Sequence, residues 1–115
     1  MSNNKFLLPA YQKIYAAIRK HDPVNLVFFE PSVIDVFGGG FFDSLGSKED
    51  KEKQVFSYHV YCPTVSQTGE PTSRKFCSVF DQLEVASKEK NVQDLKVGGF
   101  MTEFGALSDT DKSAV

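Results

Sequence analysis

Near the start of the chain, apolar residues recur at the spacing of one face of an α-helix. They fall at positions i, i+3, i+4 and i+7, at Tyr11, Ile14, Tyr15 and Ile18. Pro9 suits a first helical turn, and the basic residues 19–21 suit a helix end. The pattern predicts an amphipathic helix that ends before the turn at residues 22–23.

A second helical stripe lies in the C-terminal half of the chain. Its apolar members are three or four residues apart, at Phe76, Val79, Phe80, Leu83 and Ala86. Charged residues follow at 88–90, and Asn91 is a residue type that often ends a helix. We therefore predict a second helix that ends at Asn91.

Three short runs rich in apolar and aromatic residues alternate with these helices. They cover residues 25–31, 55–61 and 98–103, and their length and composition predict strands. The segment 55–103 is long enough for a right-handed crossover between two parallel strands. Residues 33–54 show no helical period, so we predict a surface loop whose charged run is solvated.

Helices that alternate with parallel strands predict an α/β protein. Three strands and two helices leave sheet faces uncovered and both sheet edges open. Residues 107–112 include Ser and Asp, which would start another helix. We therefore expect residues 1–115 to be a fragment of a larger repeating strand and helix architecture, whose remainder is needed for folding.

Composition narrows the choice of partners. The chain has 115 residues, of which 41% are hydrophobic and 13% aromatic, enough for a core. A net charge of -2 without a basic cluster indicates neither nucleic acid nor an anionic membrane as a partner. The longest apolar stretch, residues 26–29, is far shorter than the roughly 20 residues of a membrane span. The first residues also lack the apolar core of a secretory signal.

Polar side chains end each predicted strand. Glu30 ends the first, His59 and Tyr61 end the second, and Glu103 ends the third. The carboxyl ends of parallel strands are where α/β enzymes carry catalytic groups. Alternation along a strand places His59 and Tyr61 on one face, and Met101 on the same face as Glu103. The alternative is a structural role. His59 and Tyr61 would then be buried side chains with their hydrogen bonds made inside the core, and each carboxylate would cap the loop that follows its strand.

The two cysteines, Cys62 and Cys77, enclose a short loop with two prolines and a glycine. A bridge between them would close a loop of about 15 residues and contribute roughly 3 kcal/mol in the chain-entropy model. Two free, half-buried thiols are equally compatible with this spacing. A bridge would favour an exported protein.

Four stretches of the chain, in this order and spacing, resemble the endoglycoceramidases of glycoside hydrolase family 5. They are residues 18–23, the Phe-Glu-Pro run within 26–31, the His-x-Tyr run within 58–63, and residues 99–106 around Glu103. The resemblance implies a partial (β/α)8 TIM barrel, with residues 26–30, 55–61 and 98–103 as its fifth to seventh strands. Residues 1–115 would then be part of a single catalytic domain.

The resemblance also implies a retaining glycosidase that hydrolyses the bond between oligosaccharide and ceramide in glycosphingolipids. Glu103 would be the nucleophile, Tyr61 would bond to it, and His59 would line the sugar site. The general acid of the family ends the fourth strand, in an Asn-Glu-Pro motif that this chain lacks. Only one strand separates Glu30 from the Glu103 strand, so we assign Glu30 to substrate binding or structure rather than to the acid.

No metal or cofactor is implied, because two carboxyl groups suffice for this chemistry. The chain by itself would be inactive. The alternatives are another family 5 β-glycosidase, acting on glucosylceramide, a steryl glucoside or a glucan, and a truncated, non-catalytic remnant. The family is usually secreted or held in lysosomal or other acidic vesicles, and the location of this protein stays open.

Overall fold

The computed structural model describes residues 3–32, 40–62 and 73–105. Its elements in chain order are the π-helical turn η1 (Asn3–Leu7), α1 (Leu8–Arg19), β1 (Val27–Phe29), the 3₁₀ helix η2 (Lys48–Lys53), β2 (Gln54–Val60), α2 (Arg74–Leu95) and β3 (Gly98–Phe104). The predicted helix start at 107–112 and parts of the predicted loops, 33–39 and 63–72, lie outside the described residues.

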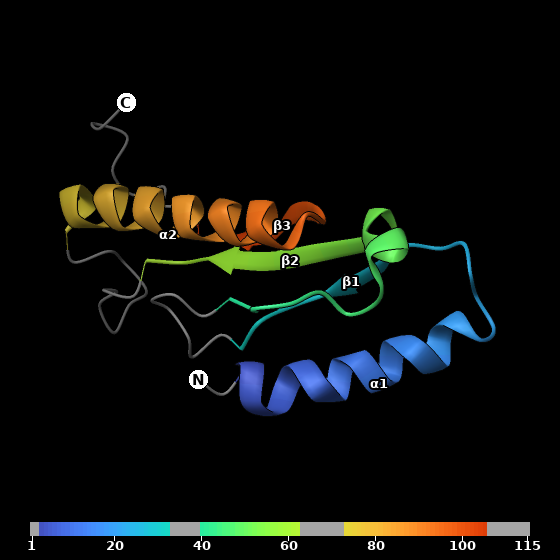
Figure 1. The fold of residues 1–115 in the computed structure, drawn as a ribbon. Helices are drawn as coiled ribbons and strands as arrows, with labels where there is room; N and C mark the ends of the chain where they lie inside the picture. Colours follow the sequence, from blue (N-terminus) through green and yellow to red (C-terminus); the bar gives the residue numbers. More distant parts are fainter. Residues whose placement is uncertain (1–2, 33–39, 63–72, 106–115) are drawn as a thin grey trace.

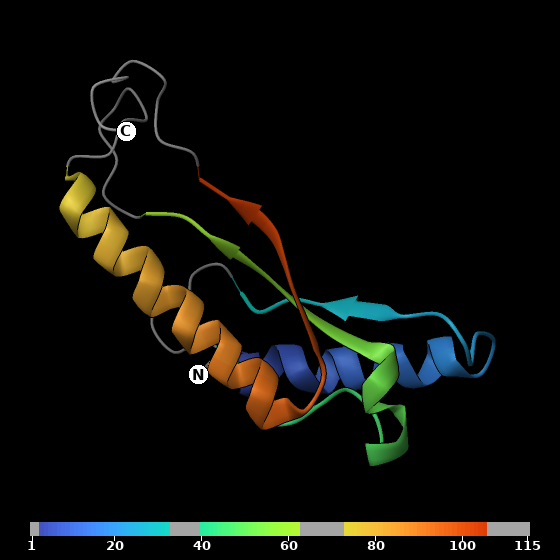
Figure 2. The same ribbon diagram turned by 90° about the horizontal axis from the view of Figure 1, so that it is seen from above.

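The three strands form one sheet in the order β1-β2-β3, and both pairs are parallel. This confirms the predicted α/β class and the crossover from β2 through α2 to β3. Figure 1 shows α1 below and α2 above the central strand, and Figure 2 shows both helices on the same side of the sheet. The described part is therefore an open sheet with helices on one face.

The core lies between the sheet and the two helices. Alternate residues of β2, namely Phe56, Tyr58 and Val60, pack with Tyr15 of α1 and Leu95 of α2 in one cluster. Phe56 is 0% exposed, and its ring contacts three aromatic rings with centroids 5.7 to 6.1 Å away. The apolar face of β2 thus meets the helices, as its alternation predicts.

The prediction of a surface loop over residues 33–54 is wrong for the short stretch around Phe41 and Leu45, whereas the charged run in η2 holds no buried residue. Phe41 is 2% exposed and Leu45 is 5% exposed, and both belong to the core cluster. The Phe41 ring lies against Phe29 and Phe56, with centroids 5.5 and 6.1 Å away. Phe41 and Leu45 are therefore held in place by packing against the strands, although the sequence around them has no helical period.

Asn91 does not end α2, contrary to the prediction. The helix continues to Leu95 and ends at Lys96, which is left-handed with φ 58°. The Asn91 side chain instead holds the backbone of Phe41: its Oδ1 accepts from the Phe41 N–H at 3.1 Å, and its Nδ2 donates to the Phe41 carbonyl at 2.8 Å. An amide can satisfy a donor and an acceptor together, which explains Asn inside a helix here.

The sheet face away from the helices is open and partly apolar. A Cβ on Gly99 would meet Val92 of α2, and Met101 packs against the core, so Phe100 between them lies on the other face. There its ring contacts Phe28 edge to face at 6.0 Å, and both rings are about half exposed. Among the described residues, no helix has the length and hydropathy to cross a bilayer.

Candidate active site

Four polar side chains meet at the carboxyl edge of the sheet. Glu30 Oε1 lies 3.1 Å from His59 Nε2, and Glu103 Oε2 lies 3.6 Å from His59 Nδ1. The Tyr61 hydroxyl donates to Glu103 Oε2 at 2.7 Å. The structure therefore brings together all four residues that the sequence predicted for this edge, because parallel strands end at the same edge.

A β-bulge turns Glu103 toward this group. Tyr58 pairs with Met101 but the next residue, His59, pairs with Glu103, so Thr102 is the extra residue. Met101 packs against the core while Glu103 faces His59 and Tyr61. The prediction that Met101 and Glu103 share a face is therefore wrong, because an inserted residue breaks the two-residue period of a strand.

Gly105 is a site residue that the sequence reasoning did not single out. A Cβ at this position would lie 2.9 Å from Tyr61 Cδ1, too close for the ring to stay in place. The Gly105 N–H also donates to the Val60 carbonyl at 3.0 Å, which extends the pairing of β2 and β3. The absence of a side chain lets the Tyr61 ring lie against the end of β3. The glycine directly after Glu103-Phe104 was the available sequence signal.

The contact with Glu103 shifts the pKa of the Tyr61 phenol. The hydrogen bond to Glu103 raises the pKa of Tyr61, and partial loss of solvent and the negative charge of Glu103 raise it further. The side chain is 50% exposed, so this shift follows mainly from the contact rather than from burial. Tyr61 therefore remains a neutral hydrogen-bond donor to Glu103 across the neutral pH range.

This contact predicts an alkaline titration. The neutral phenol donates the bond, so its stabilisation is fully present below the unfolded-state pKa of about 10 and is lost as pH rises through the raised folded-state pKa. The difference in tyrosinate absorbance between the native protein and Tyr61→Phe measures that pKa. Glu103→Gln should lower it toward the ordinary value. A Tyr61 pKa below that of free tyrosine would contradict the contact.

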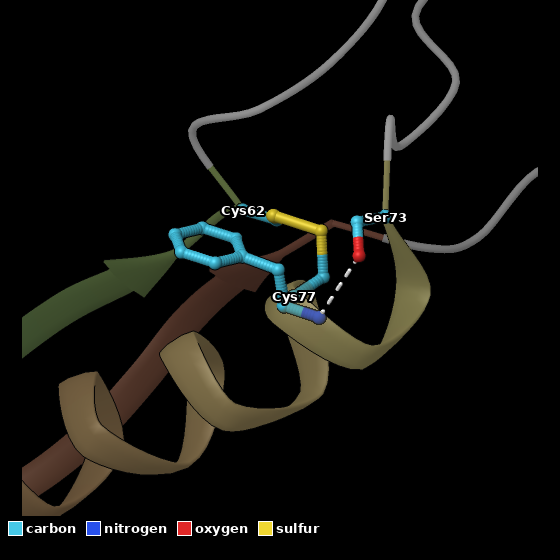
Figure 3. The surroundings of a disulfide bond; sticks show 4 residues. Cys62, Ser73 and Cys77 are labelled. Atoms are coloured by element: carbon cyan, nitrogen blue, oxygen red, sulfur yellow. Dashed lines mark hydrogen bonds between the residues drawn. A yellow bond between two sulfur atoms is a disulfide. The ribbon is translucent and has the colours of Figure 1, made fainter.

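A disulfide ties the end of the site strand to the start of α2. Cys62 follows Tyr61 directly, and its sulfur is bonded to that of Cys77, with the two Cα atoms 5.2 Å apart (Figure 3). Ser73 caps the helix beside the bridge, since its hydroxyl accepts from the Phe76 N–H and its carbonyl from the Cys77 N–H. The bridge restrains the chain one residue beyond the phenol that contacts Glu103.

Loss of this bridge is expected to destabilise the protein. The cysteines are 15 residues apart, for which the chain-entropy model gives a contribution of about 3 kcal/mol. Urea unfolding of the native polypeptide under oxidising conditions should show this loss for Cys62→Ser/Cys77→Ser. Equal stability of the variant and the oxidised protein would contradict the prediction.

These features define a class of site. A parallel α/β sheet carries a carboxylate, a phenol and an imidazole at the carboxyl ends of neighbouring strands, where enzymes of this architecture hold their reacting groups. Glu103 is about half exposed, so a ligand can reach it. Within the described ranges, no group of His, Cys, Asp and Glu side chains is arranged to hold a metal ion.

The chain is homologous to endoglycoceramidases. It is 34% identical over 112 residues to an endoglycoceramidase of Cyanea nozakii, and 33% identical over 98 residues to one of Hydra vulgaris. These alignments cover 97% and 85% of the chain but only 20% and 16% of the relatives. The chain thus spans about a fifth of the length of the first relative. No protein-family model matches the chain. No solved structure matches it either.

Proposed function

We propose that residues 1–115 form the part of a glycosidase barrel that carries the catalytic nucleophile. The complete enzyme would hydrolyse the bond between oligosaccharide and ceramide in glycosphingolipids. Homology to endoglycoceramidases over nearly the whole chain supports this assignment, and the Tyr61–Glu103 contact at the carboxyl edge is the observation that carries it. The three parallel strands would be the fifth to seventh strands of a (β/α)8 barrel.

In this mechanism Glu103 attacks the anomeric carbon of the substrate. Within the described residues, the contacts of Glu103 with the Tyr61 and His59 side chains both involve Oε2. Oε1 takes part in neither, so it is the oxygen that would form the bond to the sugar. Attack through an oxocarbenium-like transition state gives a glycosyl-enzyme ester, which water then hydrolyses with net retention of configuration.

The leaving oxygen needs a general acid about 5 Å from the nucleophile on the other side of the glycosidic bond. Glu30 fits this role poorly, because its carboxylate lies against His59 Nε2 at 3.1 Å and the His59 ring stands between it and Glu103. We therefore assign the acid to a strand outside residues 1–115. His59 and Tyr61 would line the sugar site beside Glu103.

The test begins with the native polypeptide that contains residues 99–106, isolated from source cells and sized by mass. It is incubated with a glycosphingolipid of defined glycan, and the products are identified by mass spectrometry. Release of the intact oligosaccharide and ceramide, with the β anomer formed first, is the expected result. Cleavage of only glucosylceramide, a steryl glucoside or a glucan would assign another β-glycosidase. No cleavage of any of these would leave a non-catalytic role.

A further inference from the structure

Glu30 and Glu103 contact opposite nitrogens of one imidazole. Glu30 Oε1 lies 3.1 Å from His59 Nε2, and Glu103 Oε2 lies 3.6 Å from His59 Nδ1. We propose that Glu30 is a positioning residue, which holds the His59 ring against the nucleophile. This inference rests on the proposed function of Glu103. It replaces the expectation that Glu30 binds substrate.

Glu30 stands on a rigid part of the fold. It directly follows Phe29, which is buried in the core, and it precedes Pro31, whose ring restricts the backbone. The Phe29 carbonyl accepts a hydrogen bond from the Ser57 hydroxyl at 3.3 Å, which ties the end of β1 to β2 two residues before His59. The backbone that carries Glu30 is therefore held beside β2, where its carboxylate reaches the imidazole.

A histidine ring needs such a partner to keep one orientation. Rotation about its outer torsion can exchange the places of its nitrogens and carbons, and a carboxylate at Nε2 favours the orientation that directs Nδ1 to Glu103. Which ring nitrogen of a histidine carries the proton is set by the partner of the other nitrogen. Glu30 thus determines which nitrogen of His59 meets the nucleophile.

The negative charge of Glu30 also affects how many protons the His59 ring can use to bind the two carboxylates. A ring with protons on both nitrogens can donate to both carboxylates, while a neutral ring can donate to only one of them. When Glu103 becomes an ester in the glycosyl-enzyme, it loses its negative charge, and Glu30 then remains as the anionic partner of the ring. Within the described residues, Glu103 and the Tyr61 phenol lie beside this pair, and on α1 burial and the charge of Glu30 raise the pKa of Tyr11.

The test is a double-mutant cycle in the native polypeptide with a glycosphingolipid substrate. Glu30→Ala should lower kcat by about 10- to 100-fold, the scale known for loss of a carboxylate that orients a metal-bound histidine, with little change in KM. Glu30→Gln, which keeps the shape and one acceptor oxygen, should lose less. Glu30→Ala should have no further effect in a His59→Ala background, because Glu30 acts through His59.

Each other outcome has a distinct meaning. A raised KM, or a loss of kcat that persists in the His59→Ala background, would overturn the inference and return Glu30 to substrate binding. Wild-type kcat in both Glu30 variants would also overturn it. Full activity of Glu103→Gln, by contrast, would remove the proposed function itself. Glu52→Ala is the matched control, since this exposed carboxylate lies on η2 at the opposite end of β2.

Discussion

Glu103→Gln is expected to lower kcat/KM for glycosphingolipid hydrolysis by at least about 1,000-fold in the native polypeptide, the scale typical for loss of a catalytic nucleophile. The amide has nearly the same shape as the carboxylate and can still accept the Tyr61 hydrogen bond. It has no negative charge, however, and cannot form the glycosyl ester. The variant should therefore fold like the wild type and bind substrate without turning it over.

Initial rates of oligosaccharide release measure this effect, and urea unfolding checks that the variant is folded. Glu52→Gln is the matched control, because it makes the same chemical change at an exposed position of η2. It should retain wild-type activity. Activity of Glu103→Gln within tenfold of wild type would show that Glu103 is not the nucleophile, and the glycosidase mechanism would then have to be assigned to other residues.

Phe56→Ala is expected to destabilise the protein by about 3 to 5 kcal/mol, the range for truncation of a fully buried phenylalanine. Phe56 is 0% exposed and lies in the middle strand of the sheet. Its ring packs against Phe29, Phe41 and Tyr58, which come from three different segments of the chain. The truncation therefore removes contacts that join β1, β2 and the segment before η2.

The free energy of unfolding in urea measures this loss, in the native polypeptide. Phe42→Ala provides the control, since Phe42 has the same side chain but is 90% exposed. Its truncation should change the stability by less than about 0.5 kcal/mol, as is usual for surface substitutions. Equal effects of the two substitutions would mean that the ring of Phe56 is not the centre of the core.

Much of the fold could be predicted from the sequence because the signals are local. The spacing of Tyr11, Ile14, Tyr15 and Ile18 reports one face of α1, which spans Leu8–Arg19. The alternation in β2 separates the core residues Phe56, Tyr58 and Val60 from His59. Alternating strands and helices also indicated parallel pairing, from which the meeting of Glu30, His59, Tyr61 and Glu103 at one edge follows.

Other features depend on contacts between distant residues, and no local pattern carries them. Asn91 lies 50 residues from Phe41, whose backbone it holds, and only the packing of α2 beside that segment explains it. The burial of Phe41 and Leu45 likewise depends on neighbours from other elements. The sequence left the pairing of Cys62 with Cys77 open, since spacing does not report how two cysteines approach.

In the candidate active site, too, some features follow from local sequence patterns and others from contacts between distant residues. The sequence by itself determined which residues end the parallel strands, because composition and alternation are properties of each segment. Only the tertiary structure decided the direction of Glu103, since the bulge at Thr102 arises from the register between β2 and β3. It also decided that Glu30 contacts His59, because two strands must lie side by side before their end groups can meet.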